Sequence, residues 1–275
     1  MTAGDVIVID GAVGPARQAA AFDGTDDYII ADAHAVARVA AKDTTGTYSA
    51  WIYKDVLKTH CTIISAGDND SANEFMEFRV NNGNALTGKL QQGGAIQFEC
   101  NTPYNSIKAK TWTHVAMVQN GTQVAMYING VSQTINFTTS TDKTMWYDKL
   151  ANCDKFAIGV LESNNTHTLD FSGMISDVKY WNKALTAEEV LKDYNGEALA
   201  DDGTYLQLHL LKGDNGITDQ GLGADNGTLT GHAYLCGWGS EWSRRLETSG
   251  AVVADSIQTI PYERGRARTV IVKAA

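Results

Sequence analysis

Short runs in which hydrophobic and polar residues alternate dominate most of the chain. In "WTHVAMVQNGTQVAMYINGV" (112–131), every second residue from Trp112 to Val118, and again from Val124 to Ile128, belongs to one face. This period-two alternation is typical of half-buried β-strands. Similar runs, separated by Gly, Asn and Asp, are "YSAWIYKD", "TIISAG", "EFMEFRVNNG", "AIQFEC", "KFAIGV" and "GMISDVKYW". Short strands at this spacing predict an all-β fold, an antiparallel sandwich or jelly roll.

Local signals predict one tight turn and one short helix. Asn129-Gly130 favours the positive φ angles of a two-residue hairpin turn, so Val124–Ile128 is expected to pair with a strand that begins near Val131. In "ALTAEEVLKDYNGE", Thr186 and Glu189 have the spacing of a capping box, which predicts a helix that ends before Gly196.

Isolated apolar strands near both ends divide the chain further. We expect an N-terminal strand or arm over 1–15, containing "DVIVID", a sandwich over 16–240, and a basic C-terminal arm over 241–275. Unpaired strand edges tend to pair with another strand, on the same chain or on a neighbour.

Composition and charge limit the classes of partner that we expect the chain to bind. The 275 residues are 43% hydrophobic and carry a net charge of −10, which disfavours nucleic acid as a partner. The hydrophobic runs are too short for a membrane span, and acidic residues stand where a signal peptide would be basic. We therefore expect no secretion by a signal of its own, and four free, structural cysteines.

Several segments together resemble laminin-G-like and pentraxin-like domains of the concanavalin A-like lectin/glucanase superfamily. They are "AAAFDGTDDYIIA" (19–31), "TYSAWIY" (47–53), 112–131, "FAIG" (156–159) and "FSGMISDVKYWNKALTAEEV" (171–190). The resemblance implies a jelly roll that binds glycans or proteins, in some relatives through calcium. Segment 203–235 resembles a part that normally precedes "FDGTDDY". It either completes the same sandwich as a permuted strand segment or begins a second module.

Catalytic residues are not evident. His114 alternates with Trp112 and Ala116, which favours a packed sheet residue, and no partner for a general base can be named. The Glu-x-Asp-x-x-Glu motif of the glucanase relatives is absent, and Glu74 and Glu77, three apart, lie on opposite faces of a strand. We therefore predict that the chain is not an enzyme. A glycosidase would require an unrecognised pair of carboxylates.

Calcium is the one cofactor that the resemblance implies. "SAGDNDSANEF" (65–75) resembles a pentraxin ligand loop, and "IGVLESNN" (158–165) stands where the second ligand loop would lie. The candidate ligands, which would converge on one rim, are Asp68, Asp70, Asn73, Glu162 and Asn164. Solvated turn residues are the alternative interpretation. The acidic residues of "FDGTDDY" are interpreted as a hairpin bend.

Aromatic and basic residues supply the candidate contacts with partners. Tyr104, Trp146 and Tyr147 lie in loop-like segments where they could stack on sugar rings, with core packing or lid closure as the alternatives. Arg264, Arg266 and Arg268 lie in the C-terminal arm, where a basic segment on an acidic chain suits contact with a neighbouring copy.

The combined hypothesis is a non-enzymatic binding and assembly protein of a virion, on the capsid or tail, which adheres to cell-surface glycans. It predicts a homo-oligomer or a part of a larger particle, made in a host cytoplasm. The alternative is a calcium-dependent lectin in solution, outside the cell. A glycosidase is the third hypothesis.

Overall fold

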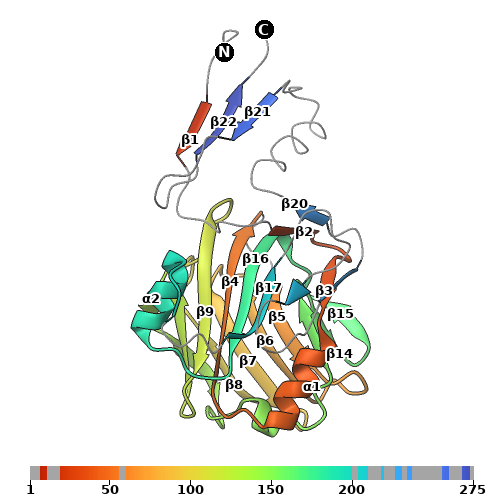
Figure 1. The fold of residues 1–275 in the computed structure, drawn as a ribbon. Coiled ribbons are helices and arrows are strands. Elements are labelled where there is room, and N and C mark those ends of the chain that lie inside the picture. The colour runs from red at the N-terminus through yellow and green to blue at the C-terminus, as the bar shows by residue number, and fades with distance from the viewer. Residues whose placement is uncertain are drawn as a thin grey trace.

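Two large antiparallel sheets form the body of the molecule. The computed structural model describes residues 7–10, 19–55, 60–199, 204–209, 218–219, 227–230, 234–236, 256–259 and 268–272. Within these residues, every pairing between named strands is antiparallel. The sheets form the two layers of a sandwich (Figure 1), which confirms the predicted all-β architecture.

The strand order of each large sheet departs from the order along the chain. Among the described residues, one sheet has nine strands: β11 (Val131–Gln133), β10 (Val124–Ile128), β9 (Trp112–Gln119), β4 (Gly46–Lys54), β16 (Ser172–Trp181), β17 (Thr204–His209) and β18 (Thr218–Asp219), with β2 (Ala19–Asp23) paired to β16 and β20 (Tyr234–Cys236) to β2. The other has eight: β12 (Asn136–Ser140), β8 (Ala95–Asn101), β7 (Leu86–Gln92), β6 (Phe75–Val80), β5 (Cys61–Gly67), β13 (Lys155–Ile158), β3 (Tyr28–Ile30) and β19 (Thr228–Thr230). A separate hairpin pairs β14 (Leu161–Ser163) with β15 (Thr166–Thr168).

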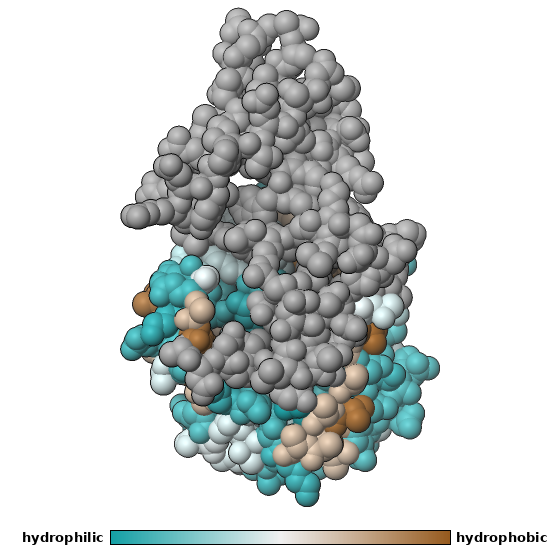
Figure 2. Space-filling view, viewed as in Figure 1, coloured by the Kyte–Doolittle hydropathy of each residue, from teal (hydrophilic) through white to brown (hydrophobic). Residues whose placement is uncertain are grey.

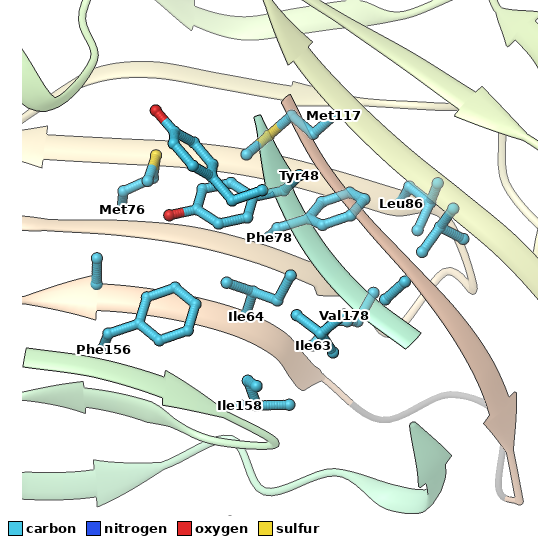
Figure 3. Close-up of a cluster of buried hydrophobic side chains, with 14 of the residues drawn as sticks. Tyr48, Ile63, Ile64, Met76, Phe78, Leu86, Met117, Phe156, Ile158 and Val178 are labelled. Carbon is cyan, nitrogen blue, oxygen red and sulfur yellow. The ribbon is translucent and has the colours of Figure 1, made fainter. Parts of the chain in front are cut away.

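Hydrophobic side chains fill the space between the two sheets. Figure 3 shows members from both: Tyr48, Met117 and Val178 from the nine-stranded sheet, and Ile63, Ile64, Met76, Phe78, Leu86, Phe156 and Ile158 from the eight-stranded sheet. Removing this apolar surface from water is the main driving force for folding. Because alternate residues of a strand point to opposite faces, Glu77 and Arg79 of β6 lie on the outer face of their sheet.

The predicted hairpin at Asn129-Gly130 is confirmed. Both residues have positive φ angles, 51° and 75°, and Ile128 stands opposite Val131 where β10 pairs with β11. The Asn129 side chain also accepts a hydrogen bond of 2.9 Å from the His114 backbone N–H. The turn is therefore tied to β9 as well.

The structure describes two helices, whereas the sequence predicted one. In α2 (Ala187–Asn195), Thr186 Oγ1 accepts the Glu189 N–H and the Glu189 carboxylate accepts the Thr186 N–H, which confirms the capping box. The second helix, α1 (Asp32–Ala41), is alanine-rich, a strong helix signal. The pattern missed it because α1 buries the polar residues His34 and Arg38 and exposes Val36.

Strands that follow α2 along the chain join both large sheets. β17 pairs with β16, β19 pairs with β3, and β20 pairs with β2. The described strands of segment 203–235 thus pair with strands of both large sheets.

The two terminal segments meet in a small sheet of their own. Its order is β1 (Ile7–Asp10), β22 (Arg268–Val272) and β21 (Ser256–Thr259), with Ile7 opposite Ile271 and Ile271 opposite Ile257. Figure 1 shows these strands beyond one end of the sandwich. The described parts of the two arms therefore pair with each other within one chain.

The described surface is mainly hydrophilic in the view of Figure 2, with small hydrophobic areas. The large hydrophobic side chains most exposed among the described residues are Val36, Tyr104, Val131 and Leu191. Cys61, Cys100 and Cys153 are buried free thiols, as predicted. No helix in the described part of the chain is long and apolar enough to cross a membrane.

Candidate functional site

Polar residues occupy the outer face of three neighbouring strands, β6, β7 and β8. The register places Lys89 of β7 between Glu77 of β6 and Glu99 of β8. The two polar rows are Glu77, Lys89 and Glu99, and Arg79, Thr87 and Asn101. Together with Asn81, which follows β6, we call these residues the polar face: Glu77, Arg79, Asn81, Thr87, Lys89, Glu99 and Asn101.

Arg79 connects the two carboxylates of the polar face. Its Nη1 donates to Glu77 Oε2 over 2.7 Å, and its Nη2 donates to Glu99 Oε1 over 3.2 Å. Thr62 Oγ1 donates a further bond of 2.7 Å to Glu77. Burial raises the pKa of Glu77, and the neighbouring Arg79 guanidinium opposes that rise. Glu77 is fully buried, whereas 23% of the Glu99 side chain is exposed, so Glu99 is the carboxylate that a ligand can reach.

Amide and hydroxyl groups form the other half of the polar face. Asn81 Nδ2 donates to Thr87 Oγ1 over 3.0 Å and to Asn101 Oδ1 over 2.9 Å, and Thr87 Oγ1 donates to Asn101 Oδ1 over 2.6 Å. Asn81 Oδ1 accepts the backbone N–H of Gly83 over 2.8 Å. These bonds fix side chains of β7 and β8 against the turn that follows β6, so the surface is held in place before any ligand binds.

Tyr104 borders the polar face at its Asn81 end. A Cβ atom built on Gly83 would lie 2.2 Å from Cδ1 of Tyr104 and 3.1 Å from Oδ1 of Asn81. The Tyr104 ring therefore lies across Gly83 next to Asn81, at a position that accepts only glycine without displacing the ring. With 78% of its surface exposed, Tyr104 is a large aromatic residue open to solvent.

This arrangement combines the groups that recognise a polyhydroxylated ligand. Glu99 offers an acceptor, Lys89 and the Asn101 side-chain amide nitrogen offer donors, and all three residues are partly exposed. Tyr104 adds an apolar ring surface with a polar hydroxyl tip. A few fixed polar groups beside an aromatic surface give both orientation and contact area to a small ligand.

Two of the three aromatic residues predicted to stack on sugars are in the core instead. Trp146 and Tyr147 are fully buried. Trp146 Nε1 donates to the Tyr180 hydroxyl over 3.3 Å, and the Tyr147 hydroxyl is hydrogen-bonded to the Tyr48 hydroxyl. The prediction is therefore wrong for Trp146 and Tyr147, because their ring area and polar atoms are used inside the protein. Tyr104 keeps its predicted exposure.

The two loops predicted to hold calcium do meet at one rim. The Asn164 N–H donates to the Asp68 carbonyl over 2.8 Å, and Ser163 Oγ lies 3.4 Å from the Ser71 carbonyl. The hairpin of β14 and β15 thus packs beside the loop between β5 and β6. Asn164 has a φ angle of 55°, which is the left-handed conformation of a tight hairpin turn.

The carboxylates of Asp68, Asp70 and Glu162 do not form a group whose ligand atoms all lie within 4.8 Å of one another. Asp68 Oδ1 accepts the Asp70 N–H over 2.9 Å, and Glu162 Oε1 lies 3.4 Å from His167 Nε2. Asn73 is exposed nearby. Among the described residues, the group of three ionisable side chains with ligand atoms within 4.8 Å of one another lies elsewhere, at the bend "FDGTDDY": Asp23, Asp26 and Asp27.

His114 is buried beneath α2 and has a carboxylate partner. Its Nε2 lies 3.0 Å from Asp193 Oδ2, which also accepts a 2.7 Å bond from Ser49 Oγ. Lys179 Nζ lies 2.6 Å from Asp193 Oδ1. In a catalytic triad the serine binds the histidine, whereas Ser49 binds the aspartate. The network joins α2 to the sheet, in agreement with the predicted structural role of His114.

The predicted arginines of the assembly arm are largely beyond the described structure. Arg264 and Arg266 lie outside the described residues, and Arg268 begins β22, of which only the backbone is described. Arg268 stands opposite Asp10 in the register of β22 with β1.

Comparison of the sequence with known families shows which superfamily it matches. A laminin-G profile described as the concanavalin A-like lectin/glucanases superfamily matches residues 23–191, more than half of the chain. The chain belongs to this superfamily. The match confirms the resemblance found in the sequence. No curated protein matches the sequence.

Solved structures similar to this superfamily member share its fold. The CBM40 of the Ruminococcus gnavus IT-sialidase, bound to α2,3-sialyllactose, is 12% identical, with a TM-score of 0.50 over 68% of this chain and 98% of that one. A proposed carbohydrate binding protein from Bacteroides ovatus is 17% identical, with a TM-score of 0.52 over 86% and 70%. The leech intramolecular trans-sialidase is 15% identical, with a TM-score of 0.51 over 74% and 29%. At these identities the likeness concerns the fold.

The polar face was missed in the sequence although a signal was present. In "EFRV", "TGKLQQ" and "QFECN", charged and amide residues alternate with core residues. Gly93-Gly94, both with positive φ, marks the turn that sets β7 against β8. Counting back from that turn would have placed Lys89 opposite Phe98, because a register shift between Leu90 and Gln91 is what brings Lys89 opposite Glu99. Motif searches within one strand could not reveal a site that is spread over three.

Proposed function

We propose that this superfamily member is a non-enzymatic glycan-binding module and that the polar face with Tyr104 is its binding site. The observation that carries the proposal is an exposed aromatic ring beside a fixed set of donors and acceptors on the outer face of a lectin-type sheet. Similar structures that carry a glycan, such as the Ruminococcus gnavus CBM40 with sialyllactose, support it.

Hydrolysis is less well supported than binding, although a carboxylate pair exists. Glu77 and Glu99 share the guanidinium of Arg79, which places their carboxyl groups within the roughly 10 Å used by glycosidases. A glycosidase needs one carboxyl to reach the glycosidic oxygen and the other to reach the anomeric carbon or its water. Glu77 has no exposed surface and is held by Arg79 and Thr62, which favours a structural role for it.

Screening of the full chain on an array of immobilised oligosaccharides tests the proposal. We expect a defined set of glycans to bind and Tyr104→Ala to weaken binding about tenfold, since an aromatic contact contributes about 1 kcal/mol or more. Val131→Ala is the matched control, because Val131 is 61% exposed on β11 of the other sheet. An equal loss of glycan binding in both variants, or an array on which no glycan binds, would reject this site.

Calcium-dependent binding is the second candidate function. The close approach of Asp23, Asp26 and Asp27 favours it, because calcium prefers several carboxylate oxygens. If calcium is required, a chelator will lower the melting temperature and abolish glycan binding. Unchanged melting and binding with chelator would remove this candidate.

We propose further that the module acts as part of a virion, on a capsid or tail, and is assembled through its terminal strands. The pairing of β1 with β22 supports a terminal unit built from both arms. The two outer strands of its sheet, β1 and β21, provide edges to which another strand could add.

A further inference from the structure

Arg79 is the residue of the polar face best suited to an anionic ligand, yet its terminal nitrogens are already engaged. Guanidinium groups bind carboxylates through two parallel N–H donors. Here Nη1 donates to Glu77 and Nη2 to Glu99. A ligand carboxylate would have to displace one of them, and displacing Glu77 would leave a fully buried carboxylate without its cation.

The remaining charges of the polar face also disfavour an anion. Lys89 is its second cation, and the register places Lys89 between Glu77 and Glu99. Lys89 Nζ lies 5.3 Å from the ring centroid of Phe75, beside the face. Two cations therefore balance two carboxylates, and the partly exposed Glu99 repels negative charge. The net charge of −10 on the chain adds a long-range repulsion.

Hydroxyl groups of a neutral sugar suit the same surface. A hydroxyl both donates and accepts, so it can donate to Glu99 and accept from Lys89 or from the Asn101 amide nitrogen without displacing Arg79 from either carboxylate. The exposed Tyr104 ring offers a surface for the apolar side of a sugar ring.

We propose that the glycan bound at the polar face is neutral: it consists of hexoses or N-acetylhexosamines that carry no carboxylate, sulfate or phosphate. The inference rests on the proposed function, because it defines the ligand class of the same site. It separates this chain from the similar Ruminococcus gnavus CBM40, which is bound to a sialylated ligand.

The test uses matched pairs of neutral and acidic glycans with the full chain. Each neutral oligosaccharide on the array stands beside its sialylated and sulfated forms, for example lactose beside α2,3-sialyllactose. For the glycans that bind, titration calorimetry then measures the affinity of both members of a pair. We expect the neutral member to bind about tenfold more tightly, since like charges placed together disfavour association.

A single substitution at Glu99 tests the physical cause. Glu99→Gln keeps an oxygen that can accept from Arg79 Nη2 but removes the exposed negative charge. We expect it to raise the affinity for the sialylated member about fivefold relative to the neutral member. Glu188→Gln is the control, because Glu188 is an exposed carboxylate on α2, which packs on the other sheet, and the net charge changes equally.

The outcomes separate this inference from the proposed function. Preference for neutral members, relaxed by Glu99→Gln and not by Glu188→Gln, supports it. Equal or tighter binding of sialylated members overturns the inference and leaves glycan binding intact. Absence of binding to every glycan in the array rejects the proposed function, and the inference with it.

Discussion

Asp193 shows how one residue can fix an element to the fold. It contacts Ser49, His114 and Lys179, which lie on three neighbouring strands of the nine-stranded sheet. Burial alone would raise the pKa of Asp193, but Lys179 and the hydrogen bond from His114 hold it well below its ordinary value. The carboxylate of Asp193 is therefore ionised and paired in the folded protein.

Replacing Asp193 should reveal this contribution. We expect Asp193→Asn to lower the free energy of unfolding by about 3 kcal/mol at pH 7, because it leaves the buried Lys179 ammonium without its main partner. A folded-state pKa that is lowered stabilises the protein above the unfolded-state value of about 4, and this contribution disappears on acidification. Urea denaturation should show the difference from wild type narrowing below pH 4.

Glu188→Gln provides the comparison for Asp193→Asn. It removes an exposed carboxylate of the same helix, paired with Lys192 at 2.9 Å, and should cost less than about 0.5 kcal/mol. Similar losses in both variants would argue against the buried network.

For single residues, the sequence predicted the strand face that a side chain occupies better than it predicted the residues that the side chain contacts. Alternation placed His114 on the strand face that it occupies, but Asp193 lies 79 residues further along the chain. The same limit hid the bond between Arg79 and Glu99, since no periodicity specifies which strands become neighbours. Trp146 and Tyr147 looked exposed because they lie between strands, yet the 3-10 turn (Tyr147–Lys149) that carries Tyr147 is folded into the core.

Among elements, those with local chemistry were predictable. The Asn129-Gly130 turn and the capping box of α2 each depend on residues within four positions of one another. The helix α1 depends on its surroundings: His34 Nε2 lies 3.0 Å from the Tyr48 hydroxyl, and Arg38 Nη1 lies 3.1 Å from Asp43. The buried face of α1 mixes the polar His34 and Arg38 with Ala35, so the hydrophobic period alone does not reveal the helix.

The N-terminus of α2 offers a test at this scale. We expect Thr186→Ala to lower the free energy of unfolding by about 1 kcal/mol, because the Glu189 N–H loses its acceptor. Thr122→Ala makes the same change in an exposed turn and should be nearly neutral. The measurement is chemical denaturation of both variants, and a neutral Thr186→Ala would contradict the assigned cap.

At the scale of the whole molecule, sequence order and strand order diverge. β3 pairs with β19 and β16 with β17, so strands from both sides of α2 complete each large sheet. The two sheets and the superfamily were predictable, because the strand pattern and the matching segments extend over much of the chain. The sequence left open whether the terminal strands pair within one chain or with a neighbouring chain; the structure pairs β1 with β22 of the same chain.

Light scattering coupled to size exclusion tests the assembly proposal. We expect the full chain to form a discrete oligomer. A chain ending at Ser240 should form an assembly with fewer subunits, since it lacks β21 and β22. A monomer for both chains at all concentrations would dismiss assembly through the terminal strands. Glycan binding by the shorter chain should persist if the sandwich alone holds the site.

A crystal structure with a bound oligosaccharide from the array would locate the glycan-binding site. We expect the sugar to lie on the outer face of β6, β7 and β8, within hydrogen-bond distance of Glu99 or Asn101 and against the ring of Tyr104. A sugar bound instead at the rim near Asp68 and Asn164, or at the bend near Asp26, would contradict this expectation.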